Sequence, residues 1–97
     1  MKRVVVIGGC VQDVLATGKA GVRIEMGTSN PGKVTTSSGG VARNIAEVIG
    51  RLGGCVHVQL VTVVGNDNAG RDLLEHARLA GVDVSLSSIV KDMRTAR

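Results

Sequence analysis

The stretch SSGGVARNIAEVIGRLGG, residues 37–54, carries the clearest structural signal of the chain. Its apolar residues recur at helical spacing and predict one stripe of an amphipathic helix, made of Val41, Ile45, Val48, Ile49 and Leu52. Gly53 and Gly54 can end this helix with a left-handed cap. The glycine pair before it, Gly39–Gly40, is either a hinge or a place where a ligand oxygen comes close to the backbone.

Strands are predicted on both sides of this helix. Residues 4–7 form an uninterrupted β-branched run, typical of a strand buried on both faces of a parallel sheet. Residues 55–64 form a second apolar run, and residues 82–86 alternate as a third strand that can continue to Val90. Between the first strand and the helix, residues 22–26 alternate and residues 33–36 can return, which predicts a small β excursion.

A second helix is predicted after the second strand. Asp67 or Asn68 can cap its start, and Gly81 can end it. Its apolar stripe comprises Ala69, Leu73, Ala77 and Ala80. Strands that alternate with helices in this order predict an α/β domain with a mainly parallel sheet.

The composition limits the classes of function. Of the 97 residues, 43% are hydrophobic, but none is Phe, Tyr or Trp, so we expect a thin core and marginal stability. The formal net charge of +4 is scattered along the chain, which argues against a nucleic-acid partner.

The apolar run after Lys2 and Arg3 is too short for a signal peptide or a membrane span. Cys10 and Cys55 lie in separate apolar runs and are expected to be buried free thiols in the cytoplasm.

Four residues are candidates for binding a ligand. Asp13 follows the first strand, Gly39 and Gly40 open the first helix, and Asn44 lies one turn into it. A carboxylate can hold two vicinal hydroxyls, and open backbone amides can meet further oxygens, so the set suits a neutral polyhydroxylated ligand. On local grounds alone, Asp13 can equally be an ordinary surface acid and the glycine pair a plain loop, and an Asn in a helix is more often solvated than bound to a ligand.

Other chemistries find less support in the residues. The first strand ends in GGCVQD rather than the GxGxxG of dinucleotide-binding proteins, which leaves a dinucleotide-binding oxidoreductase fragment as a weak alternative. Nucleophile motifs, paired catalytic carboxylates and a phosphate-binding P-loop are absent from the sequence. His57 and His76 have no evident partner and are interpreted as structural.

Four segments in this order resemble the N-terminal part of the ribokinase-like (pfkB) carbohydrate and nucleoside kinases: VVIGGCVQDV, SSGGVARN, VVGNDNAG and AGVDVS. The resemblance implies part of a three-layer α/β/α fold, with residues 1–97 as an incomplete domain and residues 14–36 as a small β lid. PGKV followed by GGVARNIAE looks most like the pseudouridine kinases, which phosphorylate the ribose 5′ hydroxyl with ATP. Ribokinases more often carry Asn where this chain has Val11, which leans away from ribokinase itself.

The resemblance implies roles for individual residues. Asp13 and Asn44 would bind sugar hydroxyls, and the Gly39 and Gly40 amides would contact the sugar. The turn with Gly65, Asp67 and Gly70 would be structural, with Asp67 orienting the following helix. Residues 94–96 would begin the next strand. The lid would be a possible homodimer surface, and a sugar or nucleoside would be the substrate.

The resemblance also implies what these residues lack. The family's GAGD motif, with its catalytic aspartate, and the sites for ATP and Mg²⁺ lie in a later part of such enzymes. No catalytic residue, metal ligand or cofactor site is therefore expected here, and the chain is expected to be a piece of a longer protein. Three functions stay open: a substrate-binding segment of a nucleoside kinase, a non-catalytic sugar-binding or dimerisation module, and the oxidoreductase fragment.

The isolated 97-residue chain should show no kinase activity, because phosphoryl transfer depends on groups that surround the γ-phosphate. The measurement is transfer of label from γ-labelled ATP to pseudouridine or ribose. Transfer above the level of a heat-denatured control would contradict the prediction.

Overall fold

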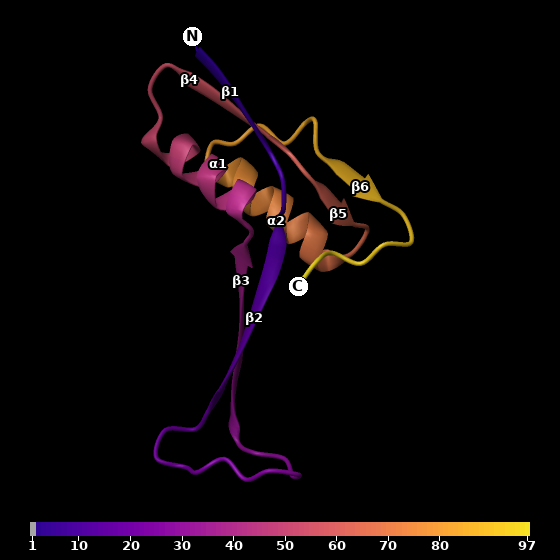
Figure 1. Ribbon diagram of the computed structural model, residues 1–97. Helices are drawn as coiled ribbons and strands as arrows, with labels where there is room; N and C mark the ends of the chain where they lie inside the picture. Colours follow the sequence, from indigo (N-terminus) through magenta and orange to yellow (C-terminus); the bar gives the residue numbers. More distant parts are fainter. Residues whose placement is uncertain (1) are drawn as a thin grey trace.

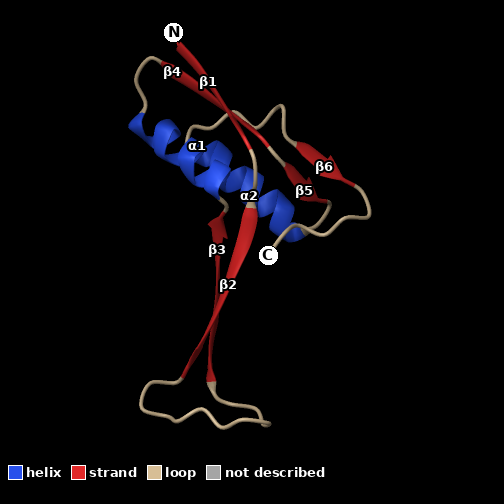
Figure 2. Ribbon diagram, in the orientation of Figure 1, coloured by secondary structure: helices blue, strands red, loops and turns tan. Residues whose placement is uncertain are grey.

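The computed structural model describes residues 2–97, which form strands and helices in the predicted α/β order (Figure 1). The elements are β1 (Lys2–Ile7), β2 (Val11–Gly18), β3 (Gly32–Gly39), α1 (Val41–Leu52), β4 (Val56–Val61), β5 (Val63–Gly65), α2 (Asn68–Leu79) and β6 (Ser88–Val90). Figure 2 shows the two helices beside the strands of the core, with β2 and β3 projecting away from it as a long ribbon.

The core strands pair in parallel, as predicted. β1 pairs with β4 in a register that runs from Lys2 opposite Val56 to Ile7 opposite Val61. β5 pairs in parallel with β6. The Leu60 N–H donates to the Asp83 carbonyl at 2.9 Å, so the segment before β6 also joins the sheet.

The predicted strand over residues 82–86 is wrong in extent. Only Asp83 bridges to Gln59 there, and the ladder resumes at Ser88. The Asp83 carboxylate accepts a hydrogen bond from the Ser85 N–H at 2.9 Å, which turns the chain after a single paired residue. Hydrogen bonds from Ser85 hold the pKa of Asp83 well below its usual range. The run over residues 55–64 is likewise divided, because Thr62 separates β4 from β5.

Both helices pack on one face of β4. The buried core joins Val58 and Leu60 of β4 with Ala42 and Ala46 of α1 and Ala77 of α2. Val58 and Leu60 point to the same face because strand side chains alternate, so the helices form one layer and the sheet the other. Alanine at the contact positions lets the helix backbones approach the sheet closely.

The opposite face of β1 is open within residues 2–97. Val5 is 47% exposed and Ile7 is 76% exposed, so the expectation that this strand is buried on both faces is not met here. Two layers of the predicted three are formed by the described residues, with both helices on the covered side (Figure 1). Neither α1 nor α2, each 12 residues long, is long and apolar enough to cross a membrane.

Helix α1 has the predicted bounds, but the predicted core stripe is wrong. Val41 and Leu52, at the two ends of that stripe, are 76% and 79% exposed. The helix instead faces the sheet with Ala42 and Ala46, and only Ile49 of the predicted stripe packs against the core. Helical spacing defines a stripe, but it does not determine which of two adjacent apolar faces meets the sheet.

The segment before α1 is a longer ribbon than the sequence predicts. β2 and β3 pair antiparallel from Val11 opposite Gly39 to Gly18 opposite Gly32. The strand expected over residues 22–26 is wrong, because that segment belongs to the loop at the far end of the ribbon. Asn30 closes this loop through hydrogen bonds with the backbone N–H and carbonyl of Glu25. The role of this ribbon as a lid stays a prediction.

Asp67 caps α2, as predicted, and it also holds the C-terminal segment. Its carboxylate accepts hydrogen bonds from the Gly70 N–H at 2.8 Å, the Thr95 N–H at 2.9 Å and the Thr95 hydroxyl at 2.6 Å. The strand expected at residues 94–96 is not formed: Thr95 binds this cap, and the segment makes only a single backbone hydrogen bond to β2, from the Gln12 N–H to the Ala96 carbonyl. The hydrogen bonds from Thr95, followed by the one from Gly70, lower the pKa of Asp67 to about 2.

The two cysteines differ in environment. Cys10 is buried against Val64 and Leu73, and burial raises the pKa of its thiol. Cys55 is exposed, so the expectation of two buried thiols is wrong for this residue. It lies between the Gly53–Gly54 turn and the first residue of β4, Val56.

Acid should destabilise the protein partly through Asp67. The folded pKa of about 2 lies below an unfolded value of about 3.9, so its stabilising contribution is present above about pH 4 and is lost as the pH falls through about 2. Asp67→Asn should lower the melting temperature at pH 7 and should reduce the further loss between those pH values. Thermal unfolding followed by circular dichroism measures both effects. Asp72→Asn, at an exposed position of α2, is the matched control, and an equal acid response in the two variants would contradict this account.

Candidate functional site

The loop after β1, the start of β2, the end of β3 and the start of α1 meet at one junction. The Gly9 carbonyl accepts a hydrogen bond from the Arg43 N–H at 3.3 Å, which ties the loop to the first turn of α1. Val11 and Gly39 are ladder partners, so the beginning of β2 lies beside the end of β3. The Gln12 N–H donates to the Ala96 carbonyl at 2.9 Å, which brings the C-terminal segment to the same place.

Asp13 and Gly39 lie in direct contact at this junction. A Cβ atom at position 39 would collide with the Asp13 carboxylate, which therefore occupies the space that a side chain would take. Asp13 is exposed, whereas Gly39 is buried. The missing side chain of Gly39 thus determines where the only carboxylate of this junction can rest.

Gly40 is held against the loop after β1. It is the N-cap residue of α1 with φ 97°, a conformation that favours glycine. A Cβ atom there would lie 2.5 Å from the Gly9 carbonyl oxygen and 3.0 Å from the Cys10 Cα. Backbone therefore packs on backbone, and the glycine pair serves close approach rather than a hinge.

The N-terminus of α1 lacks a side-chain cap, although the Gly9 carbonyl accepts a hydrogen bond from the Arg43 N–H of its first turn. This first turn contains no acidic residue. Free N–H groups and the helix dipole would ordinarily favour an anion at such a place. Here the Asp13 carboxylate already lies beside Gly39, so its charge opposes a phosphate and favours neutral hydroxyl groups, which can both donate and accept.

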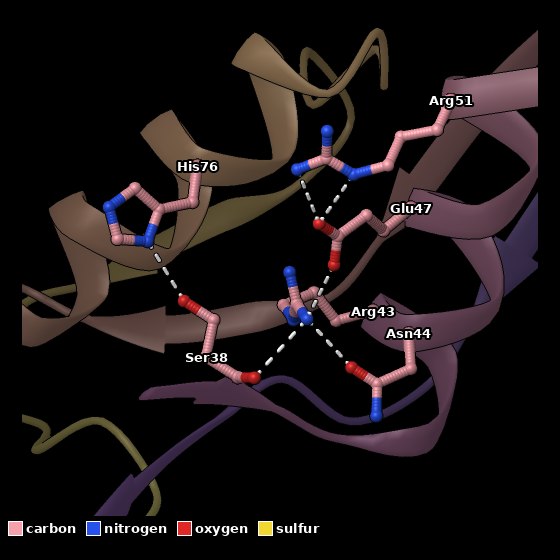
Figure 3. Close-up of polar contacts among 6 residues, drawn as sticks. All are labelled: Ser38, Arg43, Asn44, Glu47, Arg51 and His76. Atoms are coloured by element: carbon pink, nitrogen blue, oxygen red, sulfur yellow. Dashed lines mark hydrogen bonds and ion pairs between the residues drawn. The ribbon is translucent and has the colours of Figure 1, made fainter. Parts of the chain in front are cut away.

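Asn44 is exposed on the first turn of α1, and its backbone N–H donates to the Gly40 carbonyl at 2.9 Å. Its side-chain Oδ1 accepts a hydrogen bond from Arg43 Nη2 at 2.7 Å (Figure 3). The candidates are therefore linked in two pairs, Asp13 with Gly39 and Asn44 with Gly40, through adjacent glycines. No hydrogen bond joins Asp13 directly to Asn44 in the described part of the chain.

Arg43 is the residue of this site that sequence reasoning missed. It is 5% exposed, and its Nη2 also donates to the Ser38 carbonyl at 3.2 Å and pairs with Glu47 Oε2 at 2.7 Å. A signal was present in the sequence, because Arg43 lies between Ala42 and Ala46, the two small residues of α1 that face the core. An arginine at an inward position requires partners.

Glu47 extends this network to the surface. Arg51 contacts its Oε1 through Nε at 2.9 Å and Nη2 at 2.8 Å, and Figure 3 shows Glu47 between the two guanidinium groups. Hydrogen bonding from Arg51, followed by that from Arg43, lowers the pKa of Glu47. The carboxylate therefore stays charged and offsets the buried charge of Arg43.

Both histidines have partners, which corrects the expectation that neither has one. His76 Nδ1 on α2 lies 2.9 Å from the Ser38 hydroxyl on β3 (Figure 3). His57 Nε2 lies 3.0 Å from Asp83 Oδ2. Each contact joins two elements of the fold, which agrees with the structural interpretation of both residues.

The described residues do not fit ATP with Mg²⁺. Within residues 2–97, no group of three or more His, Cys, Asp and Glu side chains could hold a metal ion. The N-terminus of α1, with the Asp13 carboxylate beside it, suits hydroxyl groups better than phosphates.

Comparison with known proteins gives consistent matches. The pfkB family of carbohydrate kinases matches residues 1–97. The uncharacterized sugar kinase YeiI of Escherichia coli K12 is 44% identical over 81 residues, which are 84% of this chain and 21% of that protein. The pseudouridine kinase of the same organism is 37% identical over 93 residues, 96% of this chain and 28% of that protein. A solved carbohydrate kinase from Agrobacterium tumefaciens is 32% identical with a TM-score of 0.81, covering 98% of this chain and 29% of the other.

Two findings follow from these matches. The resemblance drawn from the sequence and the predicted fold class are confirmed. The chain spans only 21% and 28% of the lengths of the two curated relatives.

Gly40→Ala should destabilise the protein by about 1–3 kcal/mol, because a Cβ atom there both strains the backbone and meets the Gly9 carbonyl. Gly9→Ala is the matched control: it adds the same methyl group to the other partner of this contact, but on a side where nothing lies within 4 Å of the new atom. Chemical denaturation of both variants measures the difference. Equal free energies of unfolding would show that the close approach at Gly40 carries no constraint.

Proposed function

Because the chain belongs to the pfkB family of carbohydrate kinases, we propose that it forms the sugar-binding part of an ATP-dependent kinase for a ribose-bearing nucleoside. The observation that carries this proposal is the contact between the Asp13 carboxylate and Gly39 beside the uncapped N-terminus of α1. In this contact an acceptor-only group lies beside a helix N-terminus that no side chain caps, a combination that would suit the paired donor and acceptor character of vicinal hydroxyls.

In this function, each residue binds or orients the sugar. Asp13 accepts hydrogen bonds from two ribose hydroxyls, and its charge makes these bonds stronger than neutral ones. The Gly39–Gly40 backbone and Asn44 contact the remaining sugar oxygens. Such contacts fix the ribose so that its 5′ hydroxyl faces the phosphate donor, and this positioning is the main protein contribution to phosphoryl transfer. The groups that bind ATP and Mg²⁺ are assigned to other parts of the enzyme.

Pseudouridine is the substrate we favour among ribose compounds. The segments PGKV and GGVARNIAE look most like pseudouridine kinases, and a pseudouridine kinase is among the curated relatives. The chain contains no Phe, Tyr or Trp, so stacking against the base must come from residues outside it. This segment would accordingly read the ribose rather than the base.

A non-catalytic sugar-binding or dimerisation module is the second candidate, because β2 and β3 form a long ribbon with mostly exposed residues. The two functions differ in one measurement. Fusion of residues 1–97 to the remaining part of Escherichia coli pseudouridine kinase should restore ATP-dependent phosphorylation of pseudouridine if the kinase function is correct. A folded fusion protein that binds pseudouridine without phosphorylating it would favour the module.

Asp13→Ala in this fusion kinase should raise the KM for pseudouridine by about 10- to 100-fold, the equivalent of one or two hydrogen bonds to a charged group. The fold should be intact, because Asp13 is exposed. Glu75→Ala, which removes an exposed carboxylate from α2, is the control and should leave KM unchanged. Unchanged kinetics in Asp13→Ala would remove this residue from the site.

Gly39→Ala tests the same contact from the other side. The new methyl group would occupy the place of the Asp13 carboxylate, and this exposed side chain can rotate away at little cost to stability. We expect a rise in KM similar to that of Asp13→Ala and a much smaller effect when the two changes are combined than their product. Fully multiplicative effects would show that the two residues act independently.

A further inference from the structure

We propose that Arg43 is a positioning residue that fixes the side-chain amide of Asn44, so that Asn44 meets the ligand as a hydrogen-bond donor. The identity of the ligand rests on the proposed function above, but the orientation of the amide does not. Nothing in the resemblance assigns a role to Arg43, and the inference depends only on contacts within residues 38–51.

The geometry places one guanidinium nitrogen at the centre of the network. Arg43 Nη2 lies 2.7 Å from Asn44 Oδ1, 2.7 Å from Glu47 Oε2 and 3.2 Å from the Ser38 carbonyl oxygen. The first of these groups belongs to the candidate site, and the last belongs to the residue before Gly39. Arg43 therefore connects Asn44, on the first turn of α1, with the end of β3 just before Gly39.

The chemistry of arginine determines which end of the Asn44 amide is free. A guanidinium group has only donors, so the atom of Asn44 that faces it must be the acceptor Oδ1. The Nδ2 group then points away from Arg43, as Figure 3 shows. An unanchored amide could turn over and offer either atom, whereas this one offers two N–H donors.

Burial and charge hold Arg43 itself in place. Its side chain is 6% exposed, and its Nε is buried without a partner among residues 2–97. An orphaned buried donor is costly, so the contacts of Nη2 must compensate for it. Glu47 supplies the counter-charge, and Arg51, whose side chain is 66% exposed, holds Glu47 from the other side.

The orientation specifies the class of ligand atom that Asn44 can recognise. A donor at this position requires an oxygen with a free lone pair, such as a hydroxyl that itself donates elsewhere. The Asp13 carboxylate only accepts, so a hydroxyl that reaches both side chains would donate to Asp13 and accept from Asn44. Donor and acceptor are thus supplied by different side chains, and a ligand that lacks such a hydroxyl loses both hydrogen bonds.

A nuclear magnetic resonance measurement on the 97-residue chain tests the positioning without any ligand. The side-chain ¹⁵NH₂ group of Asn44 should be rigid in the wild type, with an order parameter above about 0.6, the level below which groups are flexible. Arg43→Met should lower it below that level. Arg51→Met, which shortens the same network at its exposed end without touching Asn44, should leave it unchanged. A flexible Asn44 amide in the wild type, or a rigid one in Arg43→Met, would overturn the proposal.

Arg43→Lys covers the case in which the methionine variant fails to fold. Lysine keeps the charge that Glu47 needs, but its single ammonium group cannot reproduce the planar guanidinium donors. We expect folded protein, judged by unchanged methyl shifts of Leu60 and Leu73, together with a mobile Asn44 amide. A rigid amide in folded Arg43→Lys would show that charge alone positions Asn44 and would overturn the role of the guanidinium.

Asn44→Asp tests the donor role in the fusion kinase described above. The carboxylate keeps an acceptor for Arg43, so stability should be retained or increased, while the free donor is lost. We expect a rise of 10-fold or more in the KM for pseudouridine, with a smaller change in kcat. An unchanged KM would overturn the donor role. If the fusion does not phosphorylate pseudouridine while the Asn44 amide behaves as predicted, the proposed function fails and the positioning by Arg43 stands.

Discussion

The contact on which this structure depends is backbone against backbone, where the loop after β1 meets the first turn of α1. Gly40 rests on the Gly9 carbonyl, and a Cβ atom at Gly8 would lie 2.9 Å from the Cβ of Ala42. Side chains at these places would separate the helix from the strand and carry the end of β3 away from the start of β2. The glycines thus determine where Asp13 can lie, and the ligand chemistry of the junction follows from their lack of side chains.

The electrostatics of the junction follow from that close approach. An uncapped helix N-terminus is an anion site by default, but the Asp13 carboxylate beside Gly39 supplies the negative charge itself. Below it, Arg43 is buried with a charge that Glu47 compensates. The negative charge that a ligand would meet is therefore that of Asp13, and this agrees with the neutral sugar of the proposed function.

Sequence reasoning predicted those features that local physics controls. The bounds of α1 followed from helical spacing and flanking glycines, and the Asp67 cap followed from its place before α2. It failed where tertiary contacts decide. The face of α1 that meets the sheet is made of alanines rather than of the larger Val41 and Leu52, because only small residues allow the close approach. The turn at Asp83 and the partners of Arg43 are close in sequence, but they are made by side-chain hydrogen bonds and ion pairs, which no periodic pattern records.

In the proposed function, residues 13–44 contact the sugar, and this restricts what the site can distinguish. All the groups involved are short polar side chains or backbone amides, and the 97 residues include no Phe, Tyr or Trp that could stack on a base. The site can distinguish hydroxyl patterns, because the buried Arg43 guanidinium orients Asn44 as a hydrogen-bond donor whereas Asp13 can only accept. It cannot distinguish bases, because that would need a stacking or edge-reading surface. Selectivity among nucleosides with the same ribose must therefore arise from contacts that other segments or a second subunit make to the same ligand.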